Sequence, residues 1–230
     1  MDSAQLRSDI RKLIAFTLPM AVFVVLLGLT GVGSRPENAS WLSYPAYWTY
    51  PAQTLICGAL LWWFWGDYQI GAPGKIWFAL FIGVVVFVLW IAPQQFFGFE
   101  PRSIGFDPDL FAAKPALYWG TDGFRFLRLV VVVPLVEEVF WRGFLLRYLI
   151  NERFTAVAIG TFSWLSFLGV TLAFGLAHSR ADWAAALVCG ALYNLVAYQT
   201  RSLASCAVAH ATTNLLLGLW IMQTRQWGFW

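Results

Sequence analysis

Charged residues are scarce in this sequence. Asp, Glu, Lys and Arg make up 12% of the 230 residues, hydrophobic residues make up 60%, and the mean hydropathy is +0.65. Soluble globular domains carry about 25% charged residues, so their class does not fit this chain. Because the deficit runs along the whole length, we predict an all-α, polytopic membrane helix bundle.

Basic patches, metal motifs and redox motifs are equally rare. The net charge is only +3, so we expect no nucleic-acid partner. Cys57, Cys189 and Cys206 lie inside apolar runs without CxxC spacing, and we interpret them as small buried hydrophobic residues. The GxSxG elbow of serine hydrolases does not occur, and no internal repeat is seen.

Seven apolar stretches are candidates for membrane spans, since a bilayer core of about 30 Å needs roughly 20 helical residues. They cover approximately 13–33, 46–65, 76–92, 124–149, 155–178, 183–199 and 202–222. The stretch 93–123 contains prolines, glycines and charges, so we expect an extramembrane loop with an interfacial helix within it. We predict one membrane domain over 1–230, with three helices and the loop in 1–123 and the functional core in 124–222.

The N-terminus carries a basic cluster before the first span, and no clear cleavage site follows, so we expect an uncleaved first helix. A cytoplasmic N-terminus leaves equal numbers of basic residues on the two sides, with Arg125 and Arg128 counted on the outer side. The cluster and the short inner loops favour this orientation.

Three ionisable residues interrupt the fourth stretch: Glu137, Glu138 and Arg142. Such groups inside spans are costly and usually functional. Glu138 and Arg142 are four residues apart, so on a helix they share a face and can pair. Glu137 points about 100° away and stays available for chemistry; the alternative is a purely structural clamp between helices. We interpret Gln53 and Asn194, the other polar residues within spans, as packing contacts.

The two histidines of the chain both follow the acidic pair. His178 closes the fifth stretch as FxxxH with Phe174, and its alternative interpretation is an interfacial polar residue. His210 and Asn214 form HxxxN and share one face of the seventh helix; their alternative is a hydrogen-bonded helix contact. Together, Glu137, the FxxxH motif and the HxxxN motif predict a single site.

Pro134 stands three residues before Glu137. Proline is tolerated at a helix start and breaks a helix interior, so a fresh start there would put Glu137 near a positive helix end. A helix running unbroken from residue 124 would bury Glu137 about 20 Å deep, away from His178. We therefore predict either a helix restart near Pro134 or a fifth helix that ends inside the bundle.

A carboxylate, two histidines and an asparagine can hydrolyse a carbonyl compound. The carboxylate takes a proton from water, and one histidine orients that water or shuttles the proton. The other histidine and the amide donate to the oxyanion, without an acyl-enzyme. A Glu and two His could also hold zinc, but the usual HExxH spacing is missing. We therefore expect no cofactor.

The ordered motifs EExxxR, FxxxH and HxxxN resemble those of the CAAX protease and bacteriocin-processing (CPBP, or Abi) family, whose best-known member type is the Rce1 CAAX endopeptidase. In this sequence they read Glu137–Arg142, Phe174–His178 and His210–Asn214, and the likeness covers roughly 124–222. The size and loop style resemble a bacterial subgroup related to these proteases. The resemblance implies an integral protein, which we expect in a bacterial inner membrane.

The same resemblance implies the roles of the residues. Glu137 would activate water with help from His178, His210 and Asn214 would form the oxyanion side, and the Glu138–Arg142 pair would support them without metal. The substrate would be a membrane-anchored protein or C-terminal peptide. Two alternatives remain open: a non-catalytic membrane scaffold or immunity protein, and a subunit of a proton-coupled transporter.

Overall fold

The computed structural model describes residues 3–30, 45–103 and 105–230, and their regular structure is entirely helical. No strand occurs among these residues, so the predicted all-α class is confirmed. The main helices are α1 (Ser3–Gly28), α2 (Pro45–Trp63), α4 (Ile76–Phe96), α5 (Pro115–Leu127), α8 (Trp164–Leu176), α9 (Trp183–Thr200) and α10 (Leu203–Thr224). The short helix α3 (Trp65–Tyr68) follows α2.

The helix that carries the acidic pair is longer than the sequence pattern predicts. From α5 it continues through a π-helical segment η3 (Arg128–Val132), α6 (Val133–Glu138) and a second π-helical segment η4 (Val139–Leu145) into α7 (Leu146–Tyr148). The non-helical part of the predicted loop at 93–123 is therefore shorter than expected at both ends, and helical turns occur within the stretch, as η2 (Pro108–Phe111) and the start of α5. Helix α4 passes through Pro93 to Phe96, and α5 already begins at Pro115, where the missing N–H of proline costs nothing.

Four helices of the described residues are long and apolar enough to cross a membrane. They are Gln5–Gly28, Ile76–Phe96, Arg180–Thr200 and Leu203–Thr224, and Trp164–Leu176 is a shorter apolar helix. The protein is thus an integral membrane protein by its helices, while the predicted number of about seven spans is not confirmed. The expected end of the first span, 31–33, lies outside the described residues.

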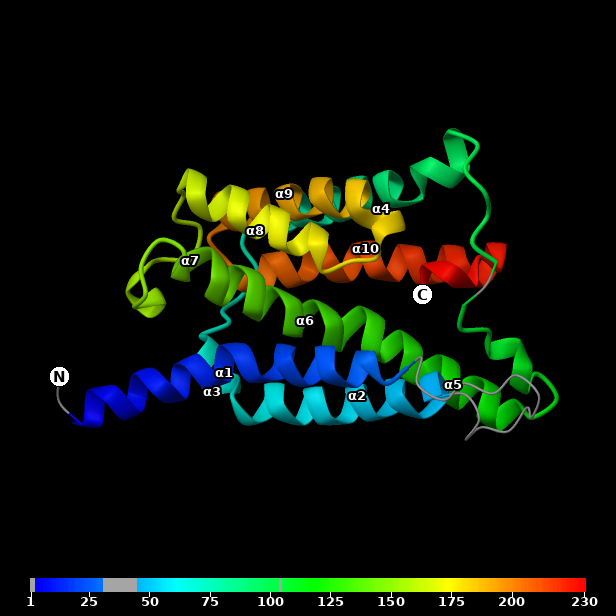
Figure 1. The fold of residues 1–230 in the computed structure, drawn as a ribbon, viewed down its shortest axis with the longest axis horizontal. Coiled ribbons are helices and arrows are strands. Elements are labelled where there is room, and N and C mark those ends of the chain that lie inside the picture. The colour runs from blue at the N-terminus through cyan, green and yellow to red at the C-terminus, as the bar shows by residue number, and fades with distance from the viewer. Residues whose placement is uncertain (1–2, 31–44, 104) are drawn as a thin grey trace.

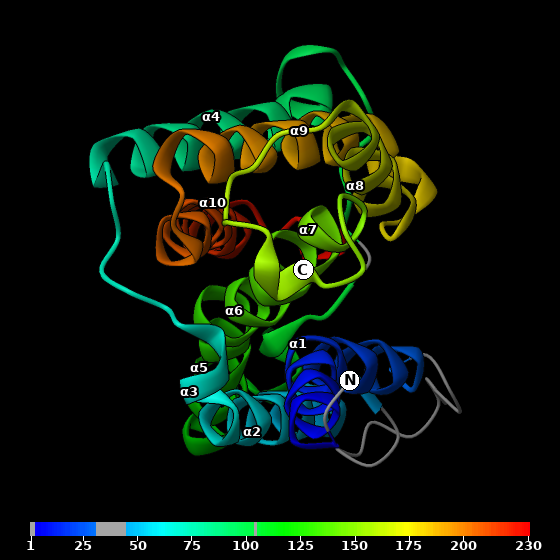
Figure 2. The ribbon, with the colours of Figure 1, turned by 90° about the vertical axis from the view of Figure 1, so that its left-hand side faces the viewer.

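The helices run along one common direction, and α10 lies at the centre of the bundle. It packs against α4, α9 and α6, while α1 packs against α2 on the far side of α6. Viewed along the bundle, α4, α8 and α9 form one side and α1 and α2 the other, with α6 and α10 between them (Figure 2). Elements far apart in the sequence therefore meet at α6 and α10.

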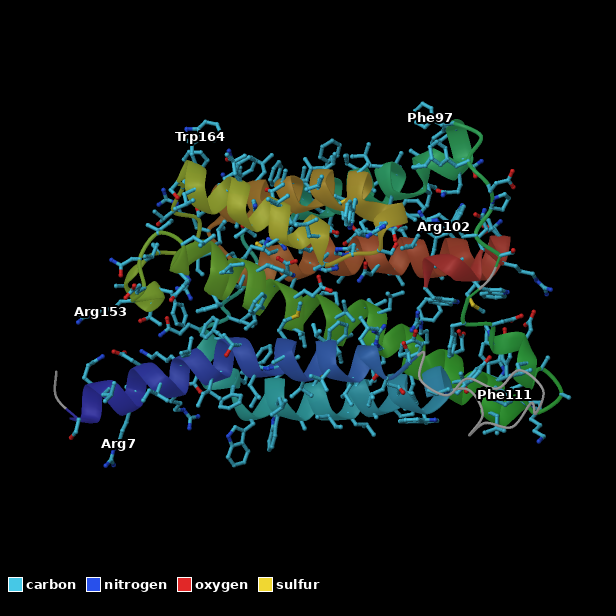
Figure 3. All side chains as sticks on the ribbon, viewed as in Figure 1. Arg7, Phe97, Arg102, Phe111, Arg153 and Trp164 are labelled. Carbon is cyan, nitrogen blue, oxygen red and sulfur yellow. The ribbon has the colours of Figure 1, made fainter. Side chains whose placement is uncertain are left out.

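The two ends of the bundle can be named by residues that lie there. Arg7 and Arg153 lie toward one end, called here the Arg153 end, and Arg102 and Phe111 lie toward the other, called the Arg102 end (Figure 3). The α5–α7 helix runs from the Arg102 end to the Arg153 end, and α6 falls midway between them (Figure 1). The acidic pair is therefore deep in the bundle.

Helix α8 begins at Trp164 near the Arg153 end and stops partway along the bundle (Figure 1). The predicted start of this helix at about 155 is wrong, because residues 151–163 form turns around the short 3-10 helix η5 (Phe154–Ala156), and the hydroxyl of Ser163 caps α8 by accepting from the N–H of Ser166. Its end inside the bundle is one of the two outcomes expected from the sequence. The other outcome, a restart at Pro134, does not occur, because the backbone stays helical from η3 into α6.

Close packing of α4 on α10 depends on a glycine. A Cβ at Gly83 would lie 2.5 Å from the carbonyl oxygen of Ala209 and 2.7 Å from the Cβ of Thr212. Only glycine lets the two backbones approach so closely. The three cysteines are free and buried, as predicted.

Candidate active site

Glu138 is buried at the centre of the bundle and accepts two hydrogen bonds on one oxygen. Its Oε1 lies 3.1 Å from Nη1 of Arg142 and 2.9 Å from Nδ1 of His210. The predicted Glu138–Arg142 pair is confirmed, with both side chains at most 1% exposed. The contact to His210, 72 residues later in the chain, was not predicted.

Arg142 uses its remaining donors on α9. Its Nε donates to Oδ1 of Asn194 at 3.1 Å, and its Nη2 donates to the carbonyl of Gly190 at 3.0 Å. Asn194 in turn donates to Oγ1 of Thr171 on α8. Asn194, interpreted from the sequence as a packing contact, is therefore part of a polar network that ties α6, η4, α8 and α9 together. A buried arginine needs such partners because an unpaired charge there is costly.

The ring of His210 is fixed on two sides. It stacks on Tyr193 with ring centroids 5.0 Å apart and an interplanar angle of 24°. The Tyr193 hydroxyl donates to Oγ1 of Thr213 at 2.7 Å, and Thr213 donates to the carbonyl of Gly83 at 2.8 Å. Since Nδ1 of His210 faces the carboxylate of Glu138, that nitrogen carries a proton, and Nε2 is the ring nitrogen that can face a ligand.

Asn214 is held by the helix on which Glu137 lies. Its Nδ2 donates to the carbonyl of Leu129 at 2.9 Å. That carbonyl lies in the π-helical segment, where Val133 donates five residues back to Arg128 and the next residue, Pro134, has no N–H to offer Leu129. The proline thus leaves a backbone acceptor for Asn214. It does not start a helix, and the predicted positive helix end beside Glu137 is wrong.

His178 lies just beyond the last turn of α8 and is half-buried. Its Nδ1 lies 2.8 Å from the carbonyl of Phe174, four residues earlier, so this nitrogen donates and Nε2 is free to accept. The ring packs against Phe174 at 4.7 Å and Trp90 at 5.5 Å between centroids. The FxxxH spacing therefore serves both to stack the ring and to fix its tautomer.

The four residues predicted as catalytic meet around one cavity. Glu137, His178, His210 and Asn214 all line a cavity of about 270 Å³ between α1, the α5–α7 helix, α8, α9 and α10. Glu137 is half-buried and makes no hydrogen bond or ion pair with any described residue. The cavity is therefore lined by a carboxylate that has no hydrogen-bond partner among the described residues, two imidazole rings that are each fixed through Nδ1, and an amide that donates to a backbone carbonyl.

Several residues that line or support this cavity were missed by reasoning from the sequence. They are Arg128, Tyr193, Thr213, Trp90 and Trp141. Aromatic and Thr residues at helical spacing look like ordinary core, so no sequence signal separates them. Arg128 did carry a signal, since a basic residue four positions inside a predicted span has to find a partner.

Among the described residues, no group of three or more His, Cys, Asp and Glu side chains has the arrangement to hold a metal ion. Nδ1 of His210 faces the carboxylate of Glu138. A histidine that binds a metal through one ring nitrogen commonly donates its other ring N–H to a carboxylate in the same way.

These features define a helical integral membrane protein with a cavity between its helices that is lined by a carboxylate, two histidines and an asparagine amide. Residues 119–216 match the family model described as Rce1-like, "Type II CAAX prenyl endopeptidase Rce1-like". The resemblance predicted from the three motifs is thereby confirmed, over a stretch that is under half of the chain. Comparison with curated proteins and with solved structures found no match.

Proposed function

We propose that this protein is an intramembrane endopeptidase that hydrolyses peptide bonds of membrane-presented substrates with a water activated by Glu137. The observation that carries the proposal is the convergence of Glu137, His178, His210 and Asn214 on one cavity between the helices. The family match over 119–216 supports a peptidase, because its description names an endopeptidase. A polar cavity inside lipid has to admit water, which is the second reactant.

In the proposed mechanism the carboxylate of Glu137 takes a proton from a water molecule as its oxygen attacks the scissile carbonyl carbon. The free Nε2 of His178 accepts the other hydrogen of that water and so orients it. The tetrahedral oxyanion receives hydrogen bonds from the Asn214 amide and from Nε2–H of His210 in its protonated form. Glu137 then gives its proton to the departing amine as the C–N bond breaks.

Glu138 has a positioning role in this mechanism. Its carboxylate holds Nδ1 of His210 and is itself neutralised by Arg142. Because Oε1 accepts both bonds, a shift of the arginine would also shift the ring. Enclosure away from bulk water strengthens each of these electrostatic contacts.

The proposal is tested by cleavage of internally quenched peptides in detergent micelles, with and without an S-farnesyl cysteine, by the purified protein. Glu137→Gln keeps the size of the side chain but removes the base, and we expect a loss of about 10²–10⁴-fold in kcat. Glu152→Gln, on the exposed turn after α7, is the matched control and should cleave like wild type. Equal cleavage by wild type and Glu137→Gln would reject the mechanism.

The same experiment separates the alternatives. A scaffold or immunity protein would show no cleavage of any peptide by wild type, and a transporter subunit would show proton-coupled uptake that depends on Glu137. We favour the peptidase because an uncommitted carboxylate beside two oriented histidines has no role in a scaffold. The substrate class that follows is a protein anchored in or presented at the bilayer; a bacterial inner membrane and a cytoplasmic N-terminus complete the proposal.

A further inference from the structure

A second cavity lies at the Arg153 end of the bundle, apart from the candidate active site. It has a volume of about 350 Å³ and lies between the first half of α1, α3 and the turn that follows it, α7, the turns after α7, and the first residues of α10. The two cavities have no described lining residue in common. Figure 2 views the molecule from this end.

Three basic side chains line this second cavity: Lys12 on α1, Arg147 on α7 and Arg201 at the end of α9. None of the three forms an ion pair with a described residue. Asp67 is the single acid among the described lining residues, and Arg11 already binds it, with Nη2 2.9 Å from Oδ2. The cavity therefore carries positive charge that the described part of the chain does not neutralise.

Arg147 is the most deeply buried of the three, with only 8% of its surface exposed. Its Nε donates to the carbonyl of Gly143, and its Nη1 donates to the carbonyl of Val157 at 3.2 Å. The guanidinium also lies over the rings of Phe16 and Phe154, at 5.5 and 5.1 Å from the centroids. These neutral contacts fix the guanidinium, but Nη2 has no hydrogen-bond partner among the described residues. Because a buried charge without a counter-ion is costly, the position favours a bound anion.

The beginning of α10 adds to the positive charge of the cavity. This helix has 22 residues, and its first residue, Leu203, lines the cavity together with its N-cap residue, Ser202. The first N–H groups of a helix have no partner within the helix and carry a partial positive charge. A phosphate is an anion that binds readily to such a helix end, and here three basic side chains lie beside it.

Exposed tryptophans indicate the height of this end in the membrane. Trp63 at the end of α2, Trp77 at the start of α4 and Trp164 at the start of α8 are all exposed. Trp164 lies toward the Arg153 end (Figure 3). Because tryptophan is enriched where the hydrocarbon core meets the lipid headgroups, the cations of the second cavity lie near the level of the lipid phosphates.

We propose that this second cavity binds the phosphate group of an anionic phospholipid. Arg147 meets the phosphate oxygens with its fixed guanidinium, Lys12 and Arg201 contact the headgroup from the rim, and apolar lining residues such as Phe16 and Ile159 pack against the glycerol part of the lipid. Basic pockets between membrane helices bind anionic headgroups in this way. A zwitterionic lipid fits less well, since its own cation lies beside three cations of the protein. The inference does not depend on the function proposed above.

The test measures binding of phosphatidylglycerol to the purified full-length protein in detergent, by native mass spectrometry and by thermal unfolding. Phosphatidylcholine and inorganic phosphate at the same concentrations are the comparison probes. We expect phosphatidylglycerol to bind saturably and to raise the Tm, because a ligand of the folded state stabilises it. Phosphatidylcholine should bind at least about 10-fold more weakly, and inorganic phosphate should not raise the Tm.

The test variant is Lys12→Gln combined with Arg201→Asn, which removes the two rim cations and keeps the structural contacts of Arg147. Asparagine is chosen because Arg201 has a φ of 51°, a left-handed conformation that asparagine tolerates. We expect phosphatidylglycerol to bind roughly 30-fold more weakly, since each basic residue near a headgroup contributes about fivefold. The matched control is Arg7→Gln combined with Arg153→Gln, which removes two exposed basic residues of the same end that do not line the cavity. It should bind like wild type.

Three results would overturn the inference. Equal binding of phosphatidylglycerol and phosphatidylcholine would show that the cavity does not select a negative charge. An equal loss of binding in the control variant would assign the attraction to the whole basic end of the bundle. A rise in Tm with inorganic phosphate as large as that with phosphatidylglycerol would make the cavity a site for a soluble anion. None of these results bears on the proposed peptidase, which Glu137→Gln tests separately.

Discussion

Asn214 on α10 donates its amide to the backbone carbonyl of Leu129, 85 residues earlier and on another helix. The carbonyl is available because the residue five positions later, Pro134, has no N–H and the helix at this point is π-helical. The carbonyl that has no partner within its own helix thus fixes the side chain of Asn214, which lies on another helix. The candidate active site depends on backbone geometry as much as on its ionisable groups.

Pro134→Ala tests this relationship. Alanine restores a backbone N–H that competes with Asn214 for the carbonyl of Leu129, so the amide loses its fixed direction. We expect kcat to fall about 10-fold, less than the roughly 10²–10³-fold lost when an oxyanion donor is removed, with the thermal stability equal to or above that of wild type. Steady-state kinetics and thermal unfolding in detergent measure both effects.

Pro93→Ala is the control for that variant, because Pro93 lies within α4 and does not line the cavity. It should leave kcat unchanged. An unaltered kcat in Pro134→Ala would contradict the role given to the proline.

Arg142 should contribute more to stability than any other charge of the site. Arg142→Met leaves the buried carboxylate of Glu138 without its cation, and breaking a buried pair in this way costs about 3–5 kcal/mol. The double variant Glu138→Leu with Arg142→Met removes both charges, so it should regain part of that loss although it remains inactive. Thermal or denaturant unfolding of the two variants checks this order, and the opposite order would show that the pair carries little energy.

Gly83 should tolerate no side chain. Valine at this position would meet the carbonyl of Ala209 and the side chain of Thr212, and would force α4 away from α10. We expect a loss of about 1–3 kcal/mol of stability, the usual cost of overpacking, together with a weaker hold on Thr213. Gly58→Val is the matched control, because a Cβ at Gly58 has no neighbour within 4 Å; equal stability of the two variants would contradict the close approach.

Metal removal distinguishes the carboxylate mechanism from a zinc mechanism. We expect peptide cleavage to be unaffected by prolonged treatment with a chelator and by added zinc, because in the proposed mechanism the carboxylate of Glu137 activates the water without a metal. Activity that disappears with chelator and returns with zinc would assign Glu137, His178 and His210 as ligands instead. The measurement uses the purified protein and the peptides described above.

The sequence predicts those features of the site that depend on local helix geometry. The four-residue spacing of Glu138 and Arg142 was enough to pair them, and the extents of the last two helices differ by no more than two residues from the predicted 183–199 and 202–222. The hydrogen bond between Glu138 and His210 could not be predicted in this way. It depends on which face of α10 meets α6, and that is decided by packing over the whole bundle.

The behaviour of two prolines has a common physical cause. The general rule that proline ends a helix set the predicted end of the third stretch at residue 92 and made a restart at Pro134 one of two expected outcomes, yet both helices continue. Inside a bundle the freed backbone groups find other partners, such as the amide of Asn214, so the local penalty does not decide the outcome. Arg128 was likewise placed outside the membrane by counting charges, whereas Gln53 and two aromatic rings hold it within the bundle.

The shortness of α8 has a consequence for the hydrogen bonding of its own backbone. Its 13 residues rise about 20 Å, some 10 Å less than a bilayer core, and non-helical chain cannot face lipid with unsatisfied peptide groups. Here the following carbonyls are satisfied from elsewhere: Trp183 donates to that of His178, and Arg102 donates to that of Ala181. The missing turns of helix are thus replaced by a peptide stretch in which side chains satisfy two of the carbonyls, and this stretch contributes Ala177, His178 and Asp182 to the wall of the cavity that holds Glu137.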